Sequence, residues 1–226
     1  MDEIVKQAMA KWPNVPHCYG WLALDARGHW RMRDERAQHF NLPGDKLSNP
    51  ALVGFINRNY ACDERGCWYF QNGPQRVYLE LEATPFIVRT DPAQGWLLHT
   101  GETLGAIDEA GLTEAGELVL RSGERVAQMD DRDGAHALSL LEIDGHPVAD
   151  DALLAWLEAS STKTPATPAT ADAKALLPGQ LVLCDGARRV PVRRLQREQL
   201  PALYSFVRSP FSLHGEVARA NGSGSV

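Results

Sequence analysis

The sequence has no excess of positive charge. Its 23 Lys and Arg residues stand against 29 Asp and Glu residues, which gives a formal net charge of -6. Proteins that bind nucleic acid without sequence preference do so by neutralising phosphates with Lys and Arg. The composition therefore argues against nucleic acid as a partner and suits a soluble protein.

Long apolar runs are also missing, and cysteines are few. No stretch approaches the roughly 20 apolar residues of a membrane-spanning helix, so we expect no membrane partner. The first residues, Met1 to Lys6, include acidic side chains where a secretory signal has basic ones, and no apolar segment follows. Without export the four cysteines are expected to be reduced thiols, and the predicted location is cytoplasmic.

Familiar catalytic motifs are absent as well. The chain has no Gly-x-Ser-x-Gly and no His-Glu-x-x-His sequence. The segment from Gly101 to Gly105 lacks the lysine of a phosphate-binding loop. We therefore assign no catalytic residues, which stay unknown, and predict no metal site and no cofactor. The sequence favours binding over catalysis.

The residues that are present describe an ordinary globular protein. Of 226 residues, 44% are hydrophobic and 23% are charged. This length can hold one sizeable core or two small ones. We expect an N-terminal α+β unit at residues 1–90 and a C-terminal α+β unit at 91–226. The second unit is expected to contain a flexible insertion at 160–174, rich in Thr, Ala and Pro, and a disordered tail at 218–226.

The stretch from Ile56 to Thr90 carries the clearest structural pattern. Val77, Leu79 and Leu81 alternate with polar neighbours, which indicates a strand with one buried face. An aromatic strand that includes Trp68 precedes it, and Phe86 begins another strand after it. We expect Trp68 and Phe86 to belong to the main core.

Three short apolar segments each enter a turn that contains glycine. They are residues 22–24, 118–120 and 181–183. An apolar helix is predicted later in the chain after each hairpin, at 51–60, 152–157 and 198–207, and a further strand is predicted at 137–143. An isolated hairpin is marginal in water until something covers its apolar face. We therefore predict an α+β fold of repeated strand-turn-strand-helix units, with antiparallel hairpins covered by short helices.

The residues from Phe55 to Arg89 also carry a family resemblance. They contain Ile-x-Arg, an acidic turn with Gly66, an aromatic strand, and Pro-x-Arg-Val-x-Leu-x-Leu-Glu-x-x-Pro-Phe-Ile-Val. This pattern resembles an uncharacterised proteobacterial family of unknown function. The resemblance implies a cytoplasmic α+β protein of repeated small motifs, with a suggested role in ligand binding or signalling. It brings no catalytic residues.

Cys62 and Cys67 depart from that family pattern. They flank a four-residue loop, so a hairpin there would place them opposite each other, at a spacing that suits a disulfide or half of a metal site. A convincing second pair of metal ligands is missing from the sequence. Two buried, reduced thiols are the favoured interpretation.

A basic patch stands out near the C-terminus of this acidic chain. It consists of Arg188, Arg189, Arg193, Arg194 and Arg197. Guanidinium forks bind carboxylate or phosphate groups with two parallel hydrogen bonds. Strand alternation places Arg189 and Arg193 on one face, with Arg188 and Arg194 as neighbours, so these four are the candidate ligand-binding residues. A solvated edge strand blunted by charge gives the same pattern.

These observations predict a small-molecule ligand-binding or regulatory module, with a small anion as the candidate ligand. An enzyme of unrecognised class and a scaffold for a protein partner are the alternatives. The sequence does not determine the oligomeric state.

Overall fold

The structure is a computed structural model that describes residues 1–158 and 179–212. The chain forms two compact units. Unit 1 comprises Met1–Pro85, His99–Gly101 and the chain from Pro201 onward, and unit 2 comprises Phe86–Leu98 and Glu102–Leu200. The sequence-based division at residue 90 stays a prediction. The expected insertion at 160–174 and tail at 218–226 lie outside the described residues.

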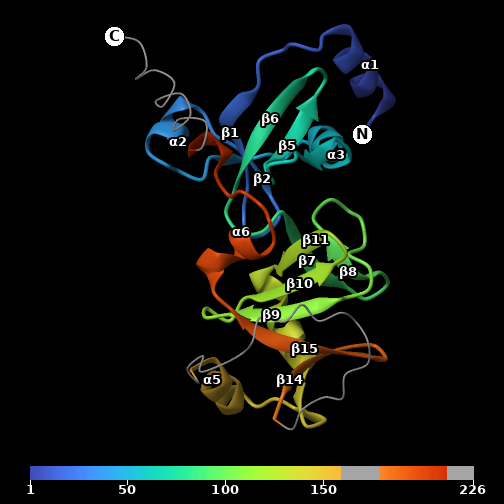
Figure 1. The fold of residues 1–226 in the computed structure, drawn as a ribbon, viewed down its shortest axis with the longest axis vertical. Helices are drawn as coiled ribbons and strands as arrows, with labels where there is room; N and C mark the ends of the chain where they lie inside the picture. Colours follow the sequence, from blue (N-terminus) through green and yellow to red (C-terminus); the bar gives the residue numbers. More distant parts are fainter. Residues whose placement is uncertain (159–178, 213–226) are drawn as a thin grey trace. The chain divides into compact units, whose positions relative to one another are not determined.

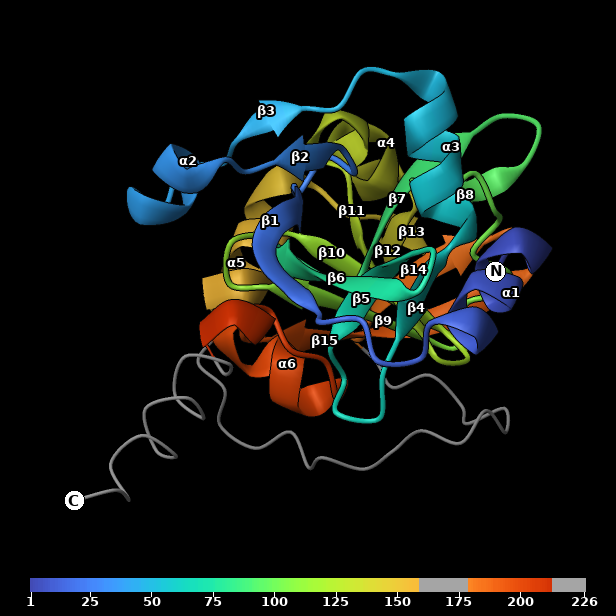
Figure 2. The ribbon, with the colours of Figure 1, turned by 90° about the horizontal axis from the view of Figure 1, so that it is seen from above.

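Unit 1 is built on a sheet whose strand order is β3-β2-β1-β6-β5-β4 (Figure 1). Its elements are α1 (Glu3–Lys11), β1 (Cys18–Leu24), β2 (Trp30–Met32), α2 (Glu35–His39), β3 (Asp45–Lys46), α3 (Pro50–Arg58), β4 (Tyr60–Cys62), β5 (Trp68–Asn72) and β6 (Gln75–Leu81). β1 and β6 pair in parallel, and the other neighbours in this sheet pair antiparallel. Figure 2 shows β1, β2 and β3 in sequence at one edge, with α2 beside them.

One face of this sheet forms the core of unit 1 because its apolar side chains alternate inward. Leu24, Trp30 and Leu79 are almost fully buried there, together with Ile56 from α3. α3 begins at Pro50 because the Asn49 side chain accepts hydrogen bonds from the amides of the next turn. α3 packs on β5, where the rings of Phe55 and Phe70 meet edge to face.

Unit 2 is built on a second sheet, of order β13-β12-β14-β15-β9-β10-β11-β7-β8. Its elements are β7 (Phe86–Asp91), β8 (Gly95–Leu98), β9 (Glu109–Thr113), β10 (Leu118–Ser122), β11 (Arg125–Met129), the 3-10 turn η1 (Asp131–Asp133), α4 (Gly134–Ser139), β12 (Leu141–Ile143), β13 (His146–Pro147), α5 (Asp150–Glu158), β14 (Leu181–Asp185), β15 (Arg188–Leu195) and the 3-10 turn η2 (Arg197–Gln199). The short helix α6 (Leu200–Leu203) begins with the last residue of unit 2.

Leucines from strands far apart in sequence fill the interior of unit 2. Leu112, Leu120, Leu141, Leu181 and Leu183 are all almost fully buried. Two parallel pairings, β11 with β7 and β15 with β9, join the hairpins into one sheet. Phe86 is buried in this unit as expected, whereas Trp68 in unit 1 is only partly buried.

The mixed sheets and short helices confirm the α+β class. The hairpins β1–β2, β10–β11 and β14–β15 pair antiparallel. The three hairpins differ in which strand pairs in parallel with a further strand. In β1–β2 it is the first strand, which pairs with β6. In the other two hairpins it is the second strand, because β11 pairs with β7 and β15 pairs with β9. The repeated unit is not confirmed and stays a prediction.

Two expected elements are wrong in detail. Residues 137–139 are helical and the strand begins only at Leu141, because a short apolar run fits either element and only Ala137 of this helix is buried.

The helix expected over 198–207 is confined to η2 and α6. Ser205 takes a positive φ of 54°, and the amide of Val207 then bonds to the carbonyl of Gly66 in the turn between β4 and β5, so the helix cannot continue.

Candidate functional site

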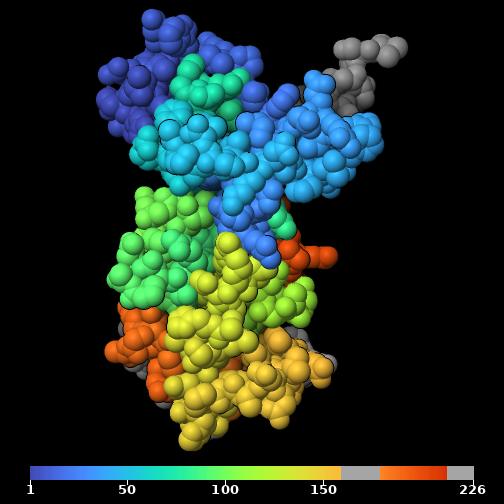
Figure 3. All heavy atoms as spheres, turned by 180° about the vertical axis from the view of Figure 1, so that it is seen from behind, coloured from blue at the N-terminus to red at the C-terminus, as the bar shows by residue number. Residues whose placement is uncertain are grey.

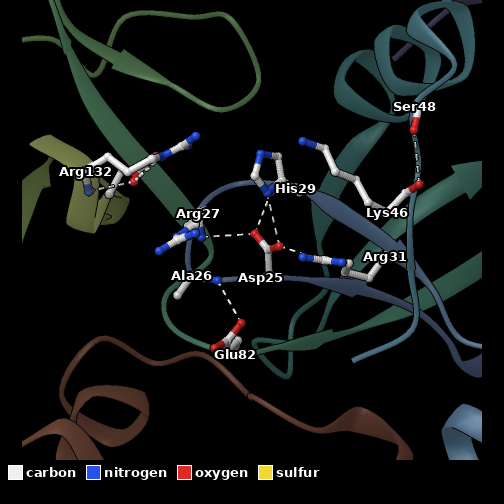
Figure 4. Close-up of polar contacts among 10 residues, drawn as sticks. Asp25, Ala26, Arg27, His29, Arg31, Lys46, Ser48, Glu82 and Arg132 are labelled. Atoms are coloured by element: carbon white, nitrogen blue, oxygen red, sulfur yellow. Dashed lines mark hydrogen bonds and ion pairs between the residues drawn. The ribbon is translucent and has the colours of Figure 1, made fainter. Parts of the chain in front are cut away.

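The turn between β1 and β2 is organised by the carboxylate of Asp25 (Figure 4). Its Oδ1 accepts hydrogen bonds from the amides of Arg27 at 3.0 Å and His29 at 2.8 Å. Gly28 has a φ of 76°, which a side chain would strain. The sequence thus builds a tight turn around an acidic residue.

The other oxygen of Asp25 binds two side chains. Oδ2 accepts from Arg31 Nε at 2.8 Å and contacts His29 Nδ1 at 3.2 Å. The Asp25 side chain is only 9% exposed. Burial by itself would raise the pKa of Asp25, but hydrogen bonds from the His29 amide, the Arg31 side chain and the Arg27 amide outweigh it and lower that pKa. Asp25 therefore stays charged and fixes the direction of Arg31.

Lys46 of β3 is a second cation near this turn. Arg31 of β2 and Lys46 of the edge strand β3 are directly paired across the two strands, so their side chains leave the same face of the sheet. Figure 4 shows Lys46 reaching toward the His29 ring. In the part of the chain that the structure describes, the Lys46 ammonium has no hydrogen bond or ion pair, and the Arg31 side chain makes no hydrogen bond or ion pair beyond its Nε contact. Like charges placed opposite each other destabilise a sheet.

The sequence-predicted arginines lie on β15 of unit 2, and their guanidinium groups have partners inside the protein. Arg189 pairs with Glu142 at 3.0 Å, and Arg193 pairs with Glu109. Arg194 donates to the carbonyl of Trp156 and lies over its ring at 4.2 Å. Arg188 reaches the carbonyl of Ile107 at 3.4 Å.

The alternation of buried and exposed side chains on β15 agrees in part with the prediction that Arg189 and Arg193 share one face. Val190 and Val192 are buried, while Arg189 is exposed and Arg193 is half-buried. Glu109, which pairs with Arg193, also pairs with Arg121 at 3.1 Å. The structure thus brings acids to these arginines, and a bound anion would have to compete with them.

A cluster of tyrosines and cations on unit 1 was not foreseen. The rings of Tyr19 and Tyr78 stack at 4.8 Å between centroids, and Tyr69 meets Tyr78 edge to face. Arg76 lies over Tyr69 at 4.6 Å. Tyr69 and Tyr78 are almost fully buried, so the cluster is chiefly packing. The pairing of Tyr69 with Tyr78 across β5 and β6 produces it, and no local sequence pattern signals that pairing.

The two cysteines of interest do not face each other. Cys62 is paired with Trp68 across β4 and β5, and Cys67 lies one position outside that pairing. The expectation that a hairpin would place them opposite each other is therefore wrong. Both are free thiols. Burial, with Asp63 and Cys67 nearby, raises the pKa of Cys62 to about 11, which disfavours a reactive thiolate.

Across residues 1–158 and 179–212, no group of His, Cys, Asp and Glu side chains is arranged to hold a metal ion. Among the same residues, no helix has both the length and the apolar character required to cross a membrane.

Comparisons with known proteins identify relatives without assigning an activity. No curated protein matches the chain. The crystal structure of a DUF1285 family protein from Silicibacter pomeroyi DSS-3 is similar with a TM-score of 0.45 at 14% identity, over 88% of this chain and 98% of that chain. A DUF1285 family protein from Shewanella baltica OS155 is similar with a TM-score of 0.35 at 12% identity, over 50% of this chain and 85% of that chain.

A family model matches residues 1–211, which is nearly the whole chain. The expected membership of an uncharacterised family is thereby confirmed. The chain belongs to the DUF2944 family, described as a protein of unknown function (DUF2946).

Proposed function

We propose that the protein is a binding or regulatory module for a small anionic ligand, and that Arg31, Lys46 and His29 form its site. One observation carries the proposal: Asp25 holds Arg31 through Nε and leaves its two terminal nitrogens without a bond, and Arg31 is paired across β2 and β3 with Lys46, whose ammonium has no partner among the described residues. A guanidinium fixed in advance loses little freedom when it binds an anion.

The surrounding charge supports this proposal. The protein as a whole has a formal charge of -6, so two cations paired across β2 and β3 are a local contrast. The cytoplasmic location is part of the same proposal and rests on cysteines that are all free thiols in the structure. The repeated strand-turn-strand-helix unit also stays a proposal about the architecture.

Calorimetric titration with nucleotides, sugar phosphates and dicarboxylates tests the function. We expect saturable binding that weakens in Lys46→Ala and in Arg31→Gln. Lys11→Ala is the matched control, because Lys11 is exposed on α1 and lies over the neighbouring Trp12 ring. Absence of binding by every anion, or equal loss in the control, would contradict the proposal.

The arginines of β15 are kept as a second proposed anion site. Arg188 is exposed and is held only by a long contact to a carbonyl, so it is the member with the most freedom to meet a ligand. The double variant Arg189→Ala with Arg193→Ala should weaken anion binding if this site is used. Binding that survives both changes assigns these arginines to ion pairs within the sheet.

One observation favours the alternative of an enzyme. The contact from His29 Nδ1 to Asp25 Oδ2 is the arrangement in which a carboxylate orients an imidazole for proton transfer. In that case the Nε2 atom of His29 would act on the ligand. Turnover of any anion that binds, lost in His29→Asn while binding is kept, would support catalysis over simple binding.

A further inference from the structure

We infer that the group recognised at Arg31, Lys46 and His29 is a phosphate monoester rather than a carboxylate. This inference rests on the proposed function and names the chemical class of its ligand. It follows from the directions of the donors, from the charge that they leave uncompensated and from the position of the nearby acids.

The donors come from separate elements. Arg31 presents two terminal nitrogens from β2, and Lys46 presents its ammonium from β3. His29 lies in the turn before β2 with its Nδ1 directed to Asp25, and Figure 4 shows the Lys46 side chain reaching toward the His29 ring. A carboxylate offers two oxygens in one plane, whereas a phosphate monoester offers three oxygens in a tetrahedral arrangement. The Arg31 fork and the Lys46 ammonium together can bond to more than two oxygens, so they match a phosphate better.

The charges at the site do not cancel. Arg31 and Lys46 contribute two positive charges, and Asp25 offsets one of them, because its carboxylate is fully engaged with Arg31, His29 and backbone amides. The site therefore keeps a net positive charge, which favours an anion over a neutral ligand.

The neighbouring acids are directed elsewhere. Asp45 adjoins Lys46 but is paired with Met32, so strand alternation places it on the opposite face. Glu82 accepts the Ala26 amide at 3.0 Å, and Figure 4 shows it on the side of the turn away from His29 and Lys46. Glu80 is paired with Ala23 across β1 and accepts the amide of Phe211. Glu80 lies in the same row of the sheet as Arg31, but no ion pair joins the two among the described residues.

A structural explanation also exists, since lysine on an edge strand protects a sheet from pairing with other chains. Edge protection requires no bound ligand and predicts no saturable site. Edge protection also gives no reason for Arg31 to lie directly opposite Lys46. That pairing of like charges weakens the sheet unless an anion lies between them.

The test is titration of the full chain at fixed ionic strength, followed by amide chemical shifts and calorimetry. The probes are inorganic phosphate, glycerol 3-phosphate, acetate and malonate. We expect the two phosphates to shift the amides of residues 25–31 and 46 in a saturable way, and to bind at least about tenfold more tightly than acetate or malonate. Lys46→Ala should weaken phosphate binding about tenfold, while Lys11→Ala should leave it unchanged.

Arg31→Lys provides a second variant that keeps the charge and removes the fork, so it should also weaken phosphate binding if the geometry is used. Sedimentation with phosphatidylcholine vesicles, with and without phosphatidic acid, identifies whether the phosphate belongs to a lipid or to a free molecule. Either source supports the inference.

Malonate binding as tightly as phosphate would overturn the phosphate assignment and leave the anion-binding function standing. Phosphate binding that Lys46→Ala and Arg31→Lys leave intact would overturn the site. Failure of every anion to bind would remove the proposed function itself.

Discussion

The hydroxyl of Tyr78 donates a hydrogen bond to Asp63 Oδ2 at 3.0 Å, from the middle of β6 to the turn between β4 and β5. Arg65 donates to the same oxygen at 2.8 Å. The other oxygen accepts the amides of Arg65 at 2.9 Å and Cys67 at 3.0 Å. One buried carboxylate therefore fastens this turn to the sheet.

We expect Asp63→Asn to destabilise the protein in a way that depends on pH. Burial by itself would raise the pKa of Asp63, but its bonds from Arg65, Cys67 and Tyr78 outweigh it, so that pKa lies below its ordinary value of 3.8. A lowered pKa stabilises the folded state above the ordinary value, and this contribution is lost as the pH falls through the lowered one. The free energy of unfolding should fall by about 1 to 3 kcal/mol at pH 7.

Urea unfolding at pH 7 and near pH 3 measures this difference, which should shrink at the lower pH. Glu64→Gln is the control, because Glu64 is the exposed neighbour in the same turn. An equal loss of stability at both pH values would show that Asp63 acts through packing instead of charge.

Replacing Trp30 by alanine should destabilise unit 1 strongly. Trp30 is 2% exposed, and its indole N–H donates to Asn57 Oδ1 at 2.7 Å. Truncation of a buried aromatic side chain costs about 3 to 5 kcal/mol. Trp12→Ala, at a site that is 51% exposed, is the control and should change the free energy of unfolding little. Trp68→Ala should fall between them, since Trp68 is only partly buried.

Arg194→Ala should loosen α5 from β15. The Arg194 side chain lies on the Trp156 ring at 4.2 Å and donates to the Trp156 carbonyl. We expect a loss of about 1 kcal/mol, with quenching or a wavelength shift of the tryptophan fluorescence. Arg188→Ala removes an exposed arginine from the same strand and should leave both quantities unchanged. An unaltered fluorescence spectrum in Arg194→Ala would mean that the contact is not maintained in solution.

Fragments of the chain should reveal where unit 2 begins. β7 starts at Phe86 and pairs with both β11 and β8, so a fragment that begins at residue 91 loses that strand. We expect residues 86–200 to give a more cooperative thermal transition by circular dichroism than residues 91–200. Equal transitions would favour the division at residue 90.

The sequence by itself determined the local elements of this protein. Alternation of Val77, Leu79 and Leu81 predicted the strand that β6 forms, although Tyr78 on its other face is buried as well. Turns that contain Gly28, Gly123 and Gly186 predicted the three hairpins, because these glycines take positive φ. Each of these signals is contained within about ten residues of sequence.

Only the tertiary structure decided which residues form the candidate site and which partners the arginines of β15 have. Arg31 of β2 is paired with Lys46 of the neighbouring strand β3, and Arg193 forms an ion pair with Glu109, which is 84 residues away in the sequence. The arginines of β15 looked like an uncompensated patch because their acidic partners lie on β9 and β12, which no local pattern connects to them. The side-chain period along a strand shows which residues share a face. Which strand lies alongside is decided by the burial of distant apolar segments against one another, and that choice determines whether a charge finds a partner or is left to bind a ligand.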